Sequence, residues 1–161
     1  MLRDGSKGGI SGILRNNKSR CIASFYGSVG QGCPLLAELL TIKYELEIFP
    51  GLIVDCNMRL IVECDSKATV EWILNPERYQ PLFLPLVHSI QSLLLLYRAF
   101  LKRIPRSANI EADALAKKGI GLLKIVYHCT WPWIIIGNTF LLVSLVRNRR
   151  HLLLLVIVGA V

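Results

Sequence analysis

Acidic residues are scarce in this chain. Its 161 residues include 11 Asp and Glu against 19 Lys and Arg, so the formal net charge is +8. This balance excludes a strongly acidic protein. It is compatible with a polyanionic partner but does not establish one.

Patterns of metal-binding cysteine and histidine are also lacking. The five cysteines contain no C-x-x-C pair, and no two Cys or His residues have the spacing of zinc ligands. No apolar segment at the N-terminus resembles a signal peptide. We therefore expect reduced, partly buried thiols in an intracellular protein, nuclear or cytoplasmic.

The hydrophobic pattern predicts an α/β fold. Strands are expected over 10–14, 20–26, 58–64 and 97–104, with a glycine-rich loop over 27–32. Helices are expected from residue 34 to the Pro50-Gly51 pair and over 67–74, 85–96 and 111–118. A first strand before Asp4 has only three residues and is therefore truncated. This order gives a mixed five-stranded sheet flanked by helices.

Four carboxylates stand out: three lie at the edge of an apolar run, from which a side chain can reach a cleft, and Glu38 lies inside an apolar helical pattern, where a free charge is costly. Asp4 follows the truncated strand, Glu38 lies early in the first helix, Asp65 follows the strand over 58–64, and Asp113 lies in the last helix. Strand ends and helix starts are where open α/β sheets place ligands. Oxygen ligands without an evident basic partner suggest Mg²⁺, and paired metal ions suit phosphodiester chemistry.

Five motifs resemble the type 1 ribonuclease H domain, in particular its plant branch of reverse-transcriptase-like proteins. They follow one another in the family's order and span about 2–121. They are D-G-S at 4–6, G-I-L-R-N at 12–16, L-L-A-E-L-L at 35–40, L-I-V-E-C-D-S-K at 60–67 and R-S-A-N-I-E-A-D-A-L-A-K at 106–117.

The resemblance implies an endonuclease that cleaves the RNA strand of RNA–DNA hybrids by a two-metal mechanism. Asp4, Glu38, Asp65 and Asp113 would be catalytic and would hold two Mg²⁺ ions, with Mn²⁺ as an alternative. Contacts to the 2′-OH would distinguish the RNA strand. No obligate protein partner is expected. The candidate residues for substrate binding are Asn16, Ser66, Arg106 and Asn109.

Each assignment has a structural alternative. Asp4 would then be a turn residue, Glu38 a charge near a helix start, Asp65 part of the next helix cap, and Asp113 a solvated helix residue. Ser66 is also a good N-cap for 67–74, while Arg106 and Asn109 can simply organise a turn. The alternative function is a catalytically degenerate nucleic-acid-binding domain of retroelement origin, with or without a membrane tether.

The composition changes sharply after residue 121, which divides the chain into a domain over 2–121 and a hydrophobic tail over 122–161. Residues 125–146 contain no Asp, Glu, Lys or Arg, and their 22 residues are enough to span a bilayer of about 30 Å. The second apolar run, 152–161, is too short to span. Three interpretations stay open: a membrane anchor, an apolar segment that packs on the domain or a partner, and an artefact of the gene model.

Overall fold

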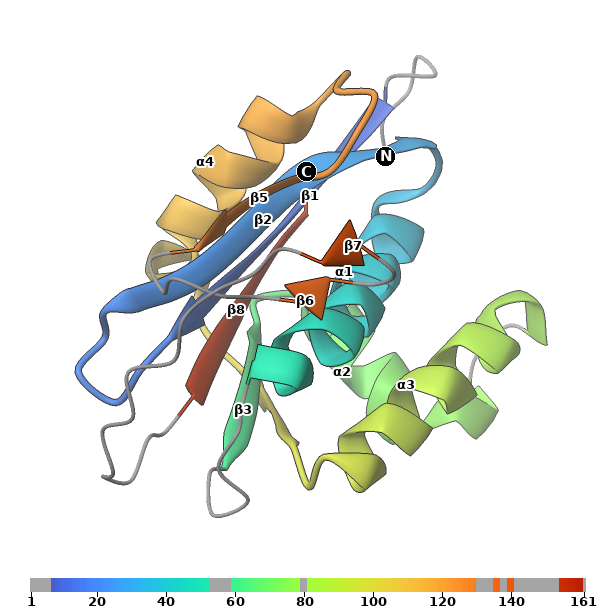
Figure 1. The fold of residues 1–161 in the computed structure, drawn as a ribbon. Helices are drawn as coiled ribbons and strands as arrows, with labels where there is room; N and C mark the ends of the chain where they lie inside the picture. Colours follow the sequence, from blue (N-terminus) through green and yellow to red (C-terminus); the bar gives the residue numbers. More distant parts are fainter. Residues whose placement is uncertain are drawn as a thin grey trace.

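The computed structural model describes residues 7–52, 59–78, 81–129, 135–136, 139–140 and 154–160 (Figure 1). The α-helices are α1 (Pro34–Ile48), α2 (Lys67–Leu74), α3 (Leu84–Leu96) and α4 (Ile110–Gly119). The strands are β1 (Lys7–Arg15), β2 (Cys21–Gln31), β3 (Leu60–Cys64), β4 (Phe100–Arg103), β5 (Val126–Cys129), β6 (Ile135–Ile136), β7 (Thr139–Phe140) and β8 (Leu154–Ala160). Short 3₁₀ turns are Phe49–Leu52, Pro76–Arg78, Pro81–Phe83 and Arg106–Ala108.

Local side-chain chemistry explains several of these boundaries. The Asn16 side-chain oxygen accepts hydrogen bonds from the backbone N–H groups of Lys18 and Arg20, at 2.9 and 3.0 Å, and closes the β1–β2 hairpin. Ser66 Oγ accepts from the Thr69 backbone N–H at 3.3 Å and caps α2. Cys33 Sγ accepts from the Leu36 backbone N–H at 3.4 Å, and Pro34 follows it as the first residue of α1.

Six strands within the described part of the chain form one sheet, in the order β4-β3-β8-β1-β2-β5. The β1 and β2 strands form an antiparallel hairpin, and β5 extends it at the edge. The β3 and β4 strands are parallel. The β8 strand lies between these two groups, parallel to β3 and antiparallel to β1. The strand nearest the C-terminus therefore lies at the centre of the sheet (Figure 1).

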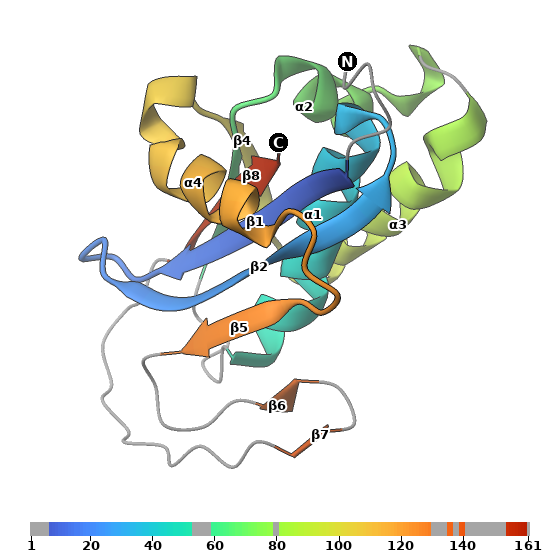
Figure 2. The ribbon, with the colours of Figure 1, turned by 90° about the horizontal axis from the view of Figure 1, so that it is seen from above.

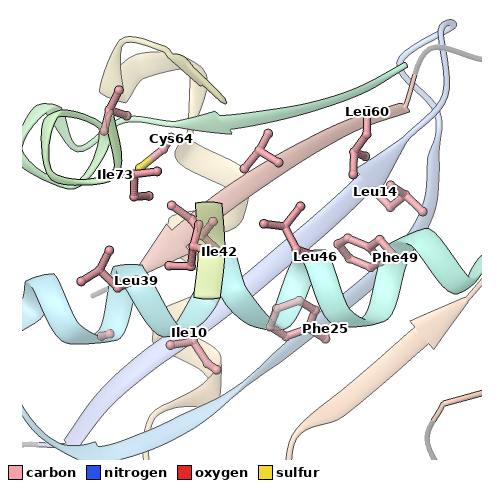
Figure 3. Packing of buried hydrophobic residues seen from close by; sticks show 14 of the residues in the cluster. Ile10, Leu14, Phe25, Leu39, Ile42, Leu46, Phe49, Leu60, Cys64 and Ile73 are labelled. Atoms are coloured by element: carbon pink, nitrogen blue, oxygen red, sulfur yellow. The ribbon is translucent and has the colours of Figure 1, made fainter. Parts of the chain in front are cut away.

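Helices cover both faces of the sheet. Figure 2 shows α4 on one face and α1 with α3 on the other. The larger core lies on the α1 face, where Leu39, Ile42 and Leu46 are fully buried (Figure 3). The core on the α4 face is small and includes Ile13, Ile104 and Ala112. The sheet is thus buried on both sides, as a mixed sheet with crossover helices requires.

Comparison with the sequence predictions confirms the α/β class and the four helices, and corrects two details. The predicted loop over 27–32 is mostly strand, because β2 continues to Gln31. The sheet has six strands in the described residues rather than five, because β5 and β8 come from the predicted tail. The truncated strand before Asp4 lies outside the described residues. The separation of domain and tail at 121–122 stays a prediction.

A membrane-spanning helix over 125–146 is not supported. None of the described helices is both long and apolar enough to cross a bilayer. Part of 125–146 forms strands instead, since β5 pairs with β2, and β6 pairs with β7 in a separate two-stranded sheet. The remainder of that segment lies outside the described residues.

Candidate active site

Asp65 lies at the carboxyl end of β3, one residue after the last residue of the strand. Its neighbour Cys64 is fully buried and is a free thiol. Burial, and to a smaller extent the negative charges of Glu38, Asp65 and Glu45, together raise the pKa of the Cys64 thiol to about 12. The end of β3 is therefore a point where several negative charges approach one another.

Asp113 lies in the first turns of α4 with most of its side chain covered. Burial raises the pKa of the Asp113 carboxyl, and the negative charge of Asp65 raises it further. Arg106 opposes both effects through an ion pair, with its Nε 3.5 Å from Asp113 Oδ2. Asp65 and Asp113 are 113 − 65 = 48 residues apart in the sequence, and the fold brings them within electrostatic reach of each other.

The strand register explains how α4 comes to lie near the end of β3. Glu63 is opposite Ile157, so Asp65, two residues on, is level with Gly159. Gly159 is opposite Ser11 on β1. Ser11 Oγ in turn donates a 2.7 Å hydrogen bond to the backbone carbonyl of Ala112, next to Asp113. The α4 helix packs on β1, β8 and β2, and β3 lies next to β8 in the same sheet.

Glu38 approaches the same region from the other face of the sheet. It lies in the second turn of α1, and its Oε2 accepts a hydrogen bond from the Thr69 hydroxyl. Thr69 Oγ1 is also 2.9 Å from Ser66 Oγ, so α1 and the N-terminus of α2 share one polar network. Glu38 is held in place by this network and lies close enough to affect the Cys64 pKa.

The other predicted site residues lie at varied positions. Asp4 lies outside the described residues. Asn16 lies five residues along the chain from Ser11, roughly 17 Å away, at the opposite end of β1 from the carboxylates. Ser66 caps α2, as its alternative interpretation predicts. Arg106 is largely exposed, whereas Asn109 is completely buried directly before α4.

Sequence reasoning missed three residues around the site. Thr69 bonds Glu38, and its position three residues after the N-cap Ser66 was the available signal. Cys64 packs beneath the carboxylates. Glu45 lies 45 − 38 = 7 residues after Glu38, two helical turns along α1, and is fully buried. Neither carboxyl oxygen of Glu45 has a hydrogen-bond partner among the described residues, and burial raises its pKa well above the ordinary value.

The donor set has the chemistry that Mg²⁺ requires, because Glu38, Asp65 and Asp113 offer only carboxylate oxygens. Burial, and then the negative charge of Asp65, raise the pKa of Asp113, and a cation bound at the carboxylates would oppose both effects. Within the described ranges, however, no three Asp, Glu, His or Cys side chains are arranged as a ready metal-binding group. The fourth predicted ligand, Asp4, is not among the described residues.

Comparison with known proteins gives a family match over most of the chain. The sequence model of the family described as reverse transcriptase-like matches residues 2–119. The search of curated proteins found no match.

Solved structures similar to this fold are ribonucleases H. LC11-RNase H1, isolated from compost by a metagenomic approach, has a TM-score of 0.65 at 21% identity, covering 73% of this chain and 88% of its own. RNase H1 from the archaeon Halobacterium salinarum has a TM-score of 0.60 at 18% identity, covering 74% and 90%. The N-terminal RNase H domain of a Mycobacterium tuberculosis protein has a TM-score of 0.57 at 23% identity, covering 71% and 84%. At these identities the likeness establishes the fold.

Proposed function

Since the chain belongs to the reverse-transcriptase-like family, whose fold here is that of ribonuclease H, we propose that it binds RNA–DNA hybrids and hydrolyses their RNA strand. The observation that carries this proposal is the family match over residues 2–119, together with a fold that brings Asp65 near Asp113. Like charges brought together by distant parts of a chain destabilise a fold unless they bind a cation. Such pairs mark functional sites more often than surface carboxylates do.

Asp65, Asp113 and Glu38, together with Asp4, would hold the Mg²⁺ ions. When bound, Mg²⁺ supplies activation of the attacking water and stabilisation of the leaving 3′ oxygen. The Thr69 hydroxyl keeps the Glu38 carboxylate oriented. Arg106 opposes the raised pKa of Asp113 and so favours its ionised form, and its exposed guanidinium is available to a phosphate of the substrate. Contacts to the 2′-OH select the RNA strand.

The test is cleavage of a hybrid labelled on its RNA strand by the full chain, with and without Mg²⁺. Single-stranded RNA and duplex DNA of the same sequence are the substrate controls. We expect Asp65→Asn to reduce cleavage at least about a hundredfold, because it removes a metal ligand. Glu77→Gln, a change in the exposed 3₁₀ turn after α2, is the matched control and should leave the rate unchanged. Metal-independent cleavage, or equal rates for both variants, would contradict the proposal.

A second candidate is a nucleic-acid-binding domain without catalysis. It is favoured by the lack of a ready three-ligand group within the described residues and by the ion pair that occupies Asp113. This candidate predicts hybrid binding that weakens with salt and that Asp65→Asn does not reduce. Binding without turnover in Mg²⁺ or Mn²⁺ would favour it over the enzyme.

A further inference from the structure

The central strand of the sheet comes from a part of the chain that the family match does not cover. The match ends at residue 119, whereas β8 spans Leu154–Ala160. On one side β8 pairs with β1 from Ile10 to Arg15, and on the other with β3 from Leu60 to Glu63. In the described sheet β1 and β3 do not pair with each other. β8 is therefore the strand that joins the two halves.

The sequence of β8 suits this position. It reads L-L-V-I-V-G-A and contains no polar or charged side chain. Both α1 and α4 pack against it, and these helices cover opposite faces of the sheet. A strand that is covered on both faces typically has a continuous apolar sequence. The apolar run over 152–161, which is too short to span a bilayer, thus has the composition of a doubly covered central strand.

The carboxylates of the candidate site are divided between the two halves that β8 joins. Asp65 follows β3, whereas Asp113 lies on α4, which rests on β1 through the Ser11–Ala112 hydrogen bond. On β8, which lies between β3 and β1, the residue level with Asp65 and Ser11 is Gly159. With one strand between them, β3 and β1 lie two strand spacings apart, about 9.6 Å.

We propose that β8 is a positioning element of the carboxylate site: it fixes how far β3, which Asp65 follows, lies from β1, on which the start of α4 rests. Without it, the backbone N–H and C=O groups of β1 and β3 that face β8 would be left without partners in a dry gap. The two halves would then shift or separate. The inference builds on the proposed function only in its choice of site, and it holds whether or not the chain cleaves nucleic acid. Its tests therefore measure structure.

The first test uses hydrogen exchange of the unmodified full chain. Amides of 154–160 should exchange at least about a hundredfold more slowly than in an unstructured peptide of the same sequence. They should open together with the β1 amides, because the two strands form one ladder. Exchange of 154–160 at the peptide rate, while the β1–β2 hairpin stays protected, would overturn the proposal.

The second test separates positioning from a general effect of the tail. Ile157→Pro removes a backbone N–H at the position where β8 faces Ile13 and Glu63, and Thr139→Pro makes the same change in the separate β6–β7 sheet. In Ile157→Pro the β1 and β3 amides that face β8 should lose protection from hydrogen exchange, because β8 no longer joins the two strands. In Thr139→Pro they should stay protected.

Each outcome of this second test supports or contradicts the positioning role of β8. If Ile157→Pro unfolds the chain while Thr139→Pro does not, β8 holds the halves together, as proposed. Wild-type helix content together with unchanged protection of these β1 and β3 amides in Ile157→Pro would show that β8 does not position the site. A cleavage assay that fails for every variant, including the wild type, would contradict the proposed function but not this inference.

Discussion

The two faces of the sheet are held to their helices in different ways. On the α1 face, large side chains fill the space, with Phe25, Phe49 and Leu46 among the fully buried ones. On the α4 face, the backbones themselves come close. A Cβ added to Gly9 would lie 2.0 Å from the Ala116 carbonyl oxygen, and one added to Gly119 would lie 2.5 Å from the Gly27 carbonyl oxygen.

This difference indicates on which face of the sheet a polar site can form. A face filled by large apolar groups leaves no room for several carboxylates without costly desolvation. Close backbone contact holds α4 with few large side chains, so Asp113 at its start can approach Asp65 from across the sheet. The large buried side chains are concentrated on the α1 face, whereas Asp113 of the candidate site comes from the thinner α4 layer.

The largest effect is expected from a cavity on the α1 face. Leu46→Ala should lower the free energy of unfolding by about 2–5 kcal/mol, since it removes a fully buried side chain. Leu123→Ala, at a side chain that is 97% exposed, is the control and should change little. Chemical denaturation measures both. Equal stability of the two variants would show that large buried side chains on the α1 face do not stabilise the fold.

A methyl group between α4 and the sheet should have the next largest effect. Gly9→Ala should destabilise the fold by about 1–3 kcal/mol, because the contact is with backbone that cannot rotate away. Gly32→Ala is the matched control, since its Cβ would meet Leu36 at 3.5 Å, an ordinary contact. If denaturation shows Gly9→Ala to be as stable as wild type, α4 is not held by close backbone packing.

The buried carboxyl on the α1 face should make stability depend on pH. Burial raises the pKa of Glu45 in the folded state above its unfolded value, so the folded state retains a proton that the unfolded state loses. Stability should therefore fall as the pH rises above the unfolded pKa of about 4.5, by at most about 1.4 kcal/mol per pH unit. Glu45→Gln should remove this slope in denaturation curves taken from pH 5 to pH 8.

The control for this slope is Glu47→Gln in the same helix. Glu47 is partly exposed and pairs with Lys43 at 2.8 Å, so its loss should cost about 0.3–0.5 kcal/mol. It should leave the fall in stability with pH as in the wild type. A wild-type slope in Glu45→Gln would show that another group carries the titration.

The smallest and most local effect concerns Asp113. Asp65→Asn removes a repelling charge and should lower the Asp113 pKa, whereas Arg106→Gln removes an attracting charge and should raise it. Carboxyl NMR titration measures both directions in otherwise folded protein. If both variants leave the pKa unchanged, the three residues do not form one electrostatic site.

Local features of the fold could be predicted from the sequence because their causes are local. Ser66 predicts the start of α2 correctly, since capping depends on residues three positions apart. The glycines of 27–32 led to an incorrect loop prediction. They instead mark a register shift in the β1–β2 ladder, with Gly30 at a φ of +79°, and a close approach of Gly27 to α4.

The candidate site could be predicted only in part. The motifs indicated Glu38, Asp65 and Asp113, and the structure brings these three toward the end of β3. The groups that hold these carboxylates in place could not be predicted. Thr69, Ser11 and β8 reach the site only through contacts between distant parts of the chain. The position of β8 depends on which strand edges remain unpaired once the rest of the chain has folded. No local sequence pattern predicts this.

The pairing of β8 with β1 also determines the order in which the chain can fold. Ile10 is opposite Ala160, a separation of 160 − 10 = 150 residues, so Ile10 is made long before its partner. Contacts this distant in sequence slow folding, because a long loop must close before they form. During synthesis, the β1–β2 hairpin and β3 emerge from the ribosome long before residues 154–160. The centre of this sheet therefore stays open until translation has passed residue 160.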